Sequence, residues 1–252
     1  MPDAARYALH RPEIREALDR GEAAILNLMG PTPQVFSAGQ TVIGMEEEHE
    51  TVHRLRTGWL ARTRRLPDGR NQIIAVFLPG DLFGIKTMFM VRQPDAVEAI
   101  TDATIDRVEQ ERLRAMMAHD FDVTLRVIWQ VIEDERRLHA WVVGLGNGNA
   151  EERVAQMLLE FRGRLARSGH IAPDAAEYRL PMKHHHIADL LGITDVHVSR
   201  VLKHLREAEV ACLERGTARL LDLRALERLA RPVQDVFERA SPEFGGGERE
   251  AT

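Results

Sequence analysis

The segment from Ile193 to Glu207, ITDVHVSRVLKHLRE, combines residue types that can contact nucleic acid at the spacing of a helix. Its apolar side chains recur at helical intervals and predict an inward face, formed by Val198, Val201, Leu202 and Leu205. The outward residues are Val196, His197, Ser199, Arg200, Lys203 and His204, followed by Arg206. Two arginines and a lysine supply three cations from Val196 to Arg206, and this stretch contains no acid. Such a face suits phosphates and base edges, so we expect these seven residues to bind DNA.

The residues before this segment predict the element that positions it. Ile187, Leu190 and Leu191 give a short preceding helix an apolar face. Gly192 permits a tight turn, and Thr194 is a suitable N-cap for the second helix. Two short helices joined in this way form a helix-turn-helix, and the later run EVACLERGTARLLDL fits a β-wing. A helical hairpin with a solvated polar face has the same spacing, so spacing alone leaves this alternative open.

Composition limits the class of protein. The 252 residues predict two domains, and 44% hydrophobic residues are enough to form a core. The formal net charge is −5, so nucleic-acid binding requires a local basic surface. The polar start of the chain has no apolar signal core, and no run approaches the ~18 apolar residues of a membrane helix. We therefore expect a soluble, cytoplasmic protein with no membrane partner.

The pattern of apolar and turn residues changes along the chain. A first helical pattern ends near Gly30, and short alternating runs with turn residues then continue to about residue 112. The turns LPDGR and LPGDLFG belong to this stretch, which predicts a compact β-roll or barrel. We predict an N-terminal helix and β-roll sensor-like domain over 1–121, a dimerisation helix over 122–146, a winged helix-turn-helix over 147–240 and a disordered tail over 241–252. The predicted fold class is therefore α+β.

The long helix carries two overlapping apolar stripes. A core helix is one interpretation, and a dimerisation helix with one stripe against its own roll and one against a partner is the other. The residues predicted to form the dimer are Leu125, Trp129, Ile132, Leu138, Trp141 and Leu145. The glycine-rich run GLGNGNA over Gly144–Ala150 predicts a hinge after this helix.

The order of these elements and the run LPMKHHHIADLLGITDVHVSRVLKHLRE resemble the Crp/Fnr family of bacterial transcription regulators over about residues 20–235. LPDGR and LPGDLFG resemble the β-roll motifs of that family. The resemblance implies a homodimer that binds double-stranded DNA at a near-palindromic site. It places the chain in the FixK-like or effector-unknown branch, with RNA polymerase as a partner if the protein is an activator.

The resemblance also assigns roles within the second helix. Arg200 matches the arginine that contacts a guanine, and Ser199 lies where many relatives have serine. The family often has Glu followed by Thr one turn earlier, whereas this chain has Val196 and His197. Valine cannot accept a hydrogen bond from cytosine, so the usual half-site is in doubt. Lys203, His204 and Arg206 are expected at phosphates, which position a protein without specifying sequence.

The roll departs from the cyclic-nucleotide-binding pattern. Relatives that bind cAMP follow the Phe-Gly turn with a glutamate and later place an arginine and a small hydroxyl residue on the cyclic phosphate. Here Gly84 is followed by Ile85 and Lys86, and the phosphate region reads Gln93, Pro94 and Asp95. An aspartate repels a phosphate, so the sequence argues against cAMP. The residues retained as weak ligand-binding candidates are Gly84, Lys86 and Arg92.

Other cofactors find little support in the sequence. The single cysteine, Cys212, excludes a cysteine-ligated iron–sulfur cluster within one protomer and leaves a redox role open. His49 and His53 share a face and could serve haem or a metal, but we expect them to be surface residues. The tract KHHH at Lys183–His186 is expected to face phosphates or solvent. We therefore predict no metal site and no cofactor.

Two other classes of function remain for comparison. A small-molecule-binding β-roll could act as a protein-interaction module without sequence-specific DNA binding, but the acid-free face of the second helix argues against this. An enzyme is the other class. The sequence contains no phosphate loop, no nucleophile elbow and no zinc-type Cys/His spacing, so we predict no catalytic residues.

Overall fold

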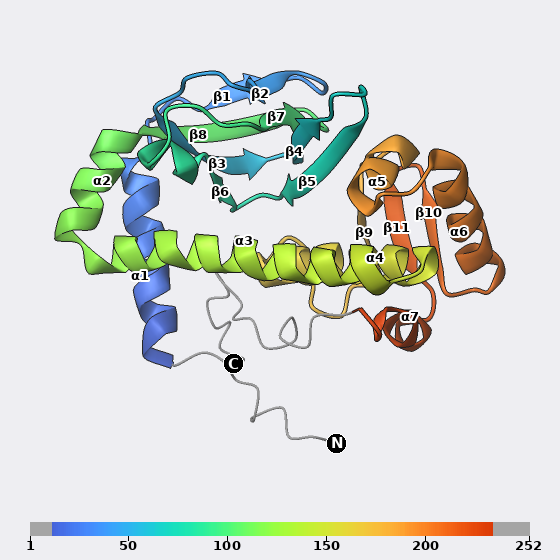
Figure 1. The fold of residues 1–252 in the computed structure, drawn as a ribbon. Coiled ribbons are helices and arrows are strands. Elements are labelled where there is room, and N and C mark those ends of the chain that lie inside the picture. Colours follow the sequence, from blue (N-terminus) through green and yellow to red (C-terminus); the bar gives the residue numbers. More distant parts are fainter. Residues whose placement is uncertain (1–11, 234–252) are drawn as a thin grey trace.

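The computed structural model describes residues 12–233, and the predicted tail over 241–252 lies outside this range. Figure 1 shows a β-roll, a long helix that passes along it, and a C-terminal domain at the far end of that helix. The predicted α+β fold is confirmed. Within residues 12–233, no helix is both long enough and apolar enough to cross a bilayer.

The N-terminal elements are α1 (Pro12–Leu28), β1 (Gln34–Phe36), β2 (Thr41–Ile43), β3 (Thr51–Thr57), β4 (Leu60–Arg65), β5 (Asn71–Phe77), β6 (Leu82–Phe83), the 3-10 helix η2 (Ile85–Met88), β7 (Ala96–Ala99), β8 (Ala103–Glu109) and α2 (Gln110–His119). The later elements are α3 (Phe121–Asn147), α4 (Ala150–Arg167), β9 (Glu177–Arg179), α5 (His184–Leu191), α6 (Asp195–Glu207), β10 (Ala211–Glu214), β11 (Thr217–Leu220) and α7 (Leu223–Ala230).

Two four-stranded antiparallel sheets form the roll, with strand orders β1-β8-β3-β6 and β2-β7-β4-β5. Buried side chains from both sheets, including Leu55, Leu60 and Phe83, share one core. The LPDGR run joins β4 to β5 as predicted, and Gly69 has the positive φ of 88° that this turn requires. The LPGDLFG run follows β5, and the chain turns there at Gly80.

The first helix crosses the long helix at Gly21. A Cβ at this position would lie 2.2 Å from the Asp122 carbonyl oxygen. The two helices can approach this closely only because residue 21 is a glycine, which has no Cβ. Ion pairs flank the crossing: Arg20 lies 2.6 Å from Asp122, and Glu22 lies 2.8 Å from Arg126. These contacts fix α1 against α3.

The break after α3 is shorter than the predicted hinge. Gly144 and Gly146 continue the helix, and the chain departs from helical structure at Gly148 and Asn149. A Cβ at Gly144 would lie 2.5 Å from the Gln156 side-chain oxygen, so this glycine allows α4 to pack closely against α3. The prediction that glycine would break the helix from residue 144 was wrong because packing outweighs the ~1 kcal/mol cost of glycine in a helix.

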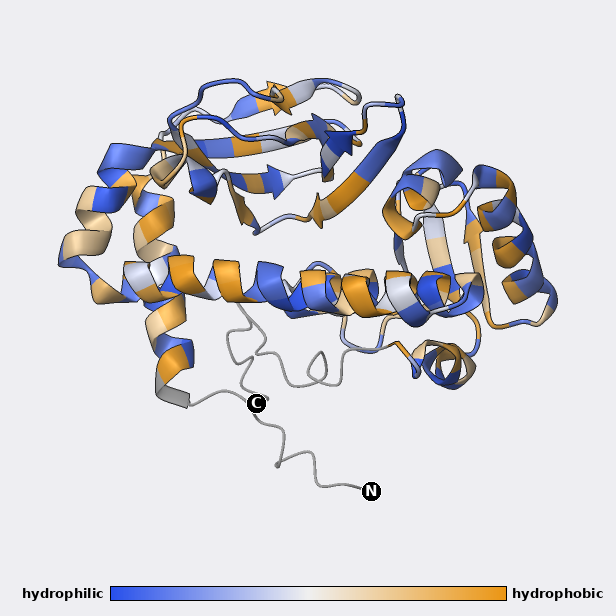
Figure 2. Ribbon diagram, in the orientation of Figure 1, coloured by the Kyte–Doolittle hydropathy of each residue, from blue (hydrophilic) through white to orange (hydrophobic). Residues whose placement is uncertain are grey.

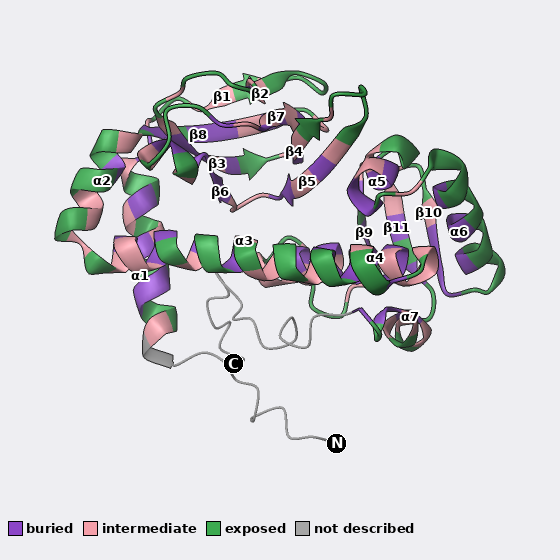
Figure 3. Ribbon diagram, viewed as in Figure 1, coloured by how far each residue is buried: buried purple, intermediate pink, exposed green. Residues whose placement is uncertain are grey.

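The C-terminal domain shares its core with the roll. Its sheet has the order β10-β11-β9, so β9, which precedes the helix-turn-helix in the chain, pairs with the wing strand β11. Trp59, Ile73 and Val76 of the roll belong to the same buried cluster as Phe161 of α4 and Leu190 of α5. Strand β5 and helix α5 pack together. Figure 2 shows apolar residues on both of these elements, and Figure 3 shows that both contain buried residues. The domain is therefore docked on its own roll.

A buried ionic cluster, which we call the Asp81 junction, also joins the two domains. Asp81 in the turn after β5 pairs with Arg164 of α4 and lies 3.6 Å from Arg137 of α3. Arg164 also donates a 2.9 Å hydrogen bond to the Val76 carbonyl. Burial raises the pKa of Asp81, but the two arginines outweigh it and hold the pKa below its ordinary value. Asp81 therefore remains charged.

Candidate nucleic-acid interface

The helix-turn-helix has the predicted geometry. α5 ends at Gly192, which adopts a left-handed conformation with φ 63°, and α6 begins at Asp195. The Thr194 hydroxyl caps α6 by accepting a 3.2 Å hydrogen bond from the His197 backbone N–H. The four predicted inward residues of α6 are buried: Val198, Val201, Leu202 and Leu205. The turn and the core therefore fix which face of α6 points outward.

The seven residues predicted to bind DNA are all exposed: Val196, His197, Ser199, Arg200, Lys203, His204 and Arg206. Among the described residues, Arg200 makes no side-chain hydrogen bond or ion pair with another residue. Lys203 lies 3.6 Å from Glu207, and Arg206 lies 3.9 Å from Glu214 of the wing. The Arg200 guanidinium is therefore available, whereas its basic neighbours have acidic partners.

The sequence did not reveal one contact of α6. The His204 imidazole lies 2.8 Å from Glu151 at the start of α4, so this side chain links two helices of the domain. His204 was predicted at a phosphate, and its exposed position leaves that prediction open. Cys212 is buried in β10, where burial limits its access to oxidants.

The histidine tract faces the roll more than was expected. His185 and His186 line a cleft of about 320 Å³ together with Ala61, Thr63 and Glu98 of the roll. The His186 ring accepts a hydrogen bond from the Lys183 backbone N–H at the start of α5. Burial lowers the pKa of His186 to about 4, so the ring is neutral and remains an acceptor. No group of three potential metal ligands occurs among residues 12–233.

The long helix exposes an apolar surface that we call the α3 stripe: Phe121, Ile128, Val131, Ile132, Leu138 and Val142, each 46–71% exposed. Two of the predicted dimer residues, Ile132 and Leu138, belong to it. Leu125, Trp129 and Leu145 are half-buried within the protomer. Trp141 is 7% exposed and lies in the core shared with α4, so its assignment to a partner surface does not fit its position. Helical periodicity identified the apolar faces but not which of them the protomer covers itself.

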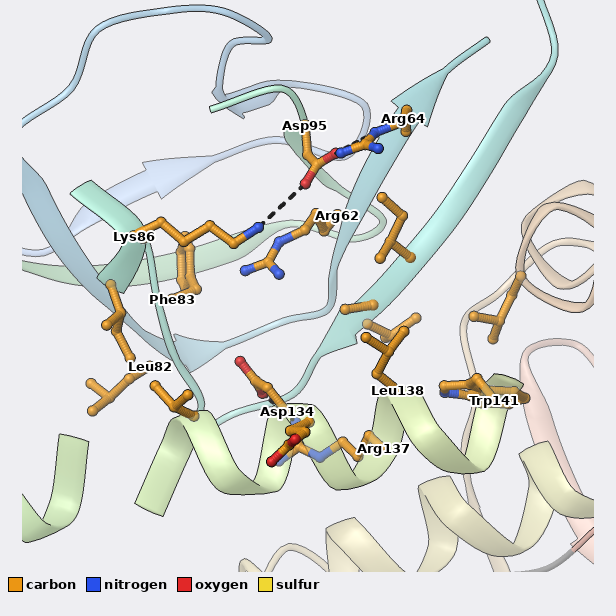
Figure 4. Close-up of a pocket in the computed structure, with 18 of the residues that line it drawn as sticks. Arg62, Arg64, Leu82, Phe83, Lys86, Asp95, Asp134, Arg137, Leu138 and Trp141 are labelled. Atoms are coloured by element: carbon orange, nitrogen blue, oxygen red, sulfur yellow. Dashed lines mark hydrogen bonds and ion pairs between the residues drawn. The ribbon is translucent and has the colours of Figure 1, made fainter. Parts of the chain in front are cut away.

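The three weak ligand-binding candidates of the roll, Gly84, Lys86 and Arg92, do not lie at one site. Gly84 and Lys86 line a cavity of about 530 Å³, whereas Arg92 is absent from its lining and lies 2.7 Å from exposed Glu48. Asp95, in the region where relatives bind the cyclic phosphate, accepts a 2.8 Å hydrogen bond from Arg64. Arg92 is therefore withdrawn from the ligand candidates. Figure 4 shows Asp95 between Lys86 and Arg64, which occupy one side of the cavity.

The two roll histidines are not surface residues. His53 is 5% exposed and stacks on Phe83 with 5.0 Å between ring centroids, and His49 is half-buried. Burial lowers the pKa of His53 to about 3, with a smaller contribution from His49. The Gln93 side chain contacts the His49 ring. The expectation of surface positions was wrong because β3 turns His53 into the roll.

Comparison with known proteins decides the family. Residues 33–120 match the cyclic nucleotide-binding domain model, and residues 152–229 match the Crp-like helix-turn-helix domain model. The nitrogen fixation regulation protein FixK of Azorhizobium caulinodans is 32% identical over 79% of this chain and 79% of its own length. The chain belongs to the Crp/Fnr family. The transcriptional regulator LdrP of Thermus thermophilus is 32% identical over 77% of this Crp/Fnr chain and 95% of LdrP.

A solved Crp/Fnr structure supports the same conclusion. FixK2 from Bradyrhizobium japonicum superposes with a TM-score of 0.71 at 30% identity, covering 79% of this chain and 96% of FixK2. The chain is a FixK-like Crp/Fnr regulator of transcription that binds DNA. This finding favours the regulator over the alternative of a β-roll interaction module, since both relatives named here are regulators.

Proposed function

We propose that this Crp/Fnr regulator acts as a homodimer that places two α6 helices in successive major grooves of a near-palindromic DNA site. The observation that carries the proposal is the outward face of α6, where Arg200 is exposed and makes no bond to another described residue. A recognition helix of this kind presents its N-terminal half to base edges, and the half-site centres lie ~34 Å apart.

Residues of the first turns specify the sequence. The Arg200 guanidinium donates two hydrogen bonds to O6 and N7 of a guanine. Val196 is 60% exposed and contacts a thymine methyl group, while His197 and Ser199 contact a base edge or a phosphate beside it. Lys203, His204 and Arg206 exchange their acidic partners for phosphates, which adds affinity without specificity. Exposed ion pairs cost little to exchange, since such pairs contribute ~0–1 kcal/mol.

The α3 stripe forms the dimer. Six apolar side chains on one exposed face of a 27-residue helix match the pattern of a helix that packs against a copy of itself. The position of the site relative to the promoter decides whether the protein activates or represses, and RNA polymerase is its partner if it activates. We place the protein in the cytoplasm, where DNA and polymerase are available, and we assign it no metal or haem.

Selection of DNA from a random pool by the purified protein, without added ligand, tests the proposal. Enrichment of two inverted half-sites spaced by about one helical turn supports it, and the recovered bases define the contacts of Val196 and His197. The selection is repeated with Arg200→Ala, because this side chain is exposed and makes no hydrogen bond or ion pair with another described residue. An unchanged enriched sequence with this variant would contradict the role of Arg200. Absence of any enrichment, with purified protein and again with added cell extract, would contradict the function.

A further inference from the structure

The cavity of about 530 Å³ lies where the roll, α3 and the C-terminal domain meet. Its lining includes Ile74 of β5, Leu138 and Trp141 of α3, and Phe161 and Leu190 of the C-terminal domain. Cavities of this size hold small organic molecules, typically with an apolar lining and a few polar groups. A molecule in this cavity would touch both domains of the protein at once.

Most charged groups that line the cavity have a partner of opposite charge. Arg64 and Lys86 lie 2.6 Å and 3.7 Å from Asp95. Asp134 lies 3.2 Å from Arg137. On the far side, Arg164 pairs with Asp81 and lies 3.6 Å from Glu160. Glu135 is exposed to solvent, and its neighbour His139, at 3.9 Å, carries an opposite charge only when it is protonated. Glu135 apart, these charges are balanced within the protein.

Arg62 is the exception among the described cations that line the cavity. Its Nε is buried without a hydrogen-bond partner, and its guanidinium makes no ion pair with a carboxylate. The guanidinium carbon lies 5.1 Å from the Phe77 ring centroid. Figure 4 shows the guanidinium pointing into the cavity, between Lys86 on one side and Asp134 on the other. Asp134 acts on Arg62 only across the cavity, so the buried N–H of Arg62 has no acceptor among the described residues, and a buried donor without an acceptor is unfavourable.

We propose that this cavity binds a small organic acid, with its anionic group held by Arg62 and its apolar body against Ile74, Trp141 and Phe161. A guanidinium can donate two parallel hydrogen bonds to a carboxylate or sulfonate, which fixes the orientation of the ligand. Lys86 contributes a second positive charge from η2. The anion therefore binds at Arg62 on β4 rather than at Gln93 and Asp95, whose side chains contact His49 and Arg64.

The acids around the cavity are compatible with such a ligand. Asp95 is engaged by Arg64 and Lys86. Asp134 faces Arg62 from α3, and burial raises its pKa although Arg137 and Arg62 oppose this. Burial and the neighbouring Arg62 lower the pKa of Lys86, against the influence of Asp95, which indicates crowding of positive charge at the anion position.

Calorimetric titration of the full-length protein with three probes of equal chain length tests the proposal: octanoate, octanol and octylammonium. We expect octanoate to bind at least about tenfold more tightly than octanol, since a hydrogen bond to a charged group contributes ~1.5–3 kcal/mol. Octylammonium should bind most weakly. The comparison uses unaltered protein and no DNA, so its outcome is separate from that of the proposed DNA contacts.

Arg62→Gln should weaken octanoate binding by about tenfold or more and leave octanol binding within about twofold. Arg65→Gln is the matched control, because it removes the same charge from an exposed position on the same strand. Circular dichroism establishes that both variants are folded. The proposal is overturned if the unaltered protein does not bind octanoate, binds octanol equally well, or if folded Arg62→Gln binds octanoate as tightly as Arg65→Gln.

Discussion

The Asp81 junction is a contact that a single substitution can test. Asp81→Asn preserves the shape of the side chain but removes the charge that faces two arginines. Arg164 has a side chain only 6% exposed and Arg137 one 15% exposed, so neither can recover the loss by moving into water. Removal of one partner from a buried ion pair costs ~3–5 kcal/mol when the remaining charge is left buried alone. Arg164 and Arg137 keep Glu160 and Asp134 as neighbours at 3.6 Å and 3.2 Å, which places the expected loss at the lower end of this range. We expect the free energy of unfolding to fall by this amount.

The chain provides a matched control in its other hairpin turn. Asp68 also lies 2.7 Å from an arginine, Arg70, but these side chains are 52% and 76% exposed. Asp68→Asn should therefore change the free energy of unfolding much less than Asp81→Asn, because exposed ion pairs contribute little to stability. Urea unfolding followed by circular dichroism and tryptophan fluorescence measures both variants. If Asp81→Asn destabilises the protein no more than Asp68→Asn, the junction does not hold the domains together as described.

The pH dependence gives an independent measurement of the same group. Because the pKa of Asp81 is lower in the folded protein than in the unfolded chain, its contribution is present above the unfolded value of ~3.9. The contribution is lost as the pH falls through the folded pKa. Acid unfolding of the original protein should show this loss, whereas Asp81→Asn should lack this part of the pH dependence.

Three further predictions concern DNA binding, assembly and pH. Arg200→Ala should lose ~1–3 kcal/mol of specific binding per half-site in duplex titrations, whereas Lys203→Ala should weaken specific and scrambled duplexes alike. Val142→Glu should give monomers in sedimentation, since it buries a charge in the α3 stripe, whereas Val35→Glu, at a 75% exposed valine of the roll, should not. The pKa of His53 falls to about 3 on folding, so stability should decrease as pH falls from ~6.5 toward that value, and His53→Leu should remove this slope in acid unfolding.

The DNA-binding face could be predicted because the information is local. Gly192, Thr194 and the spacing of four apolar residues determine the turn, the cap and the buried side of α6 within one short segment. Periodicity then fixes which residues point outward, including Arg200. The hairpin at Gly69 followed from its own turn sequence in the same way.

Contacts between distant segments could not be predicted from the same signals. Trp141 repeats on an apolar stripe, but only the path of α4 shows that its own protomer buries it. Asp81 and Arg164 are 83 residues apart, and nothing in either segment indicates the other. Gly144 was predicted to break a helix, whereas it makes room for Gln156. In each case the tertiary neighbour decides the role of the residue.

The shared core has a consequence for engineering. Trp59, Ile73 and Val76 belong to the N-terminal half of the sequence but pack with the helix-turn-helix domain. If that domain were replaced with one from a relative, these three side chains and Asp81 would face a new domain surface. The residues that they contact in this protein would be missing from that surface. A functional hybrid therefore needs the outer surface of β4 and β5 to be exchanged together with residues 150–230, rather than a simple joining of two modules at Gly148.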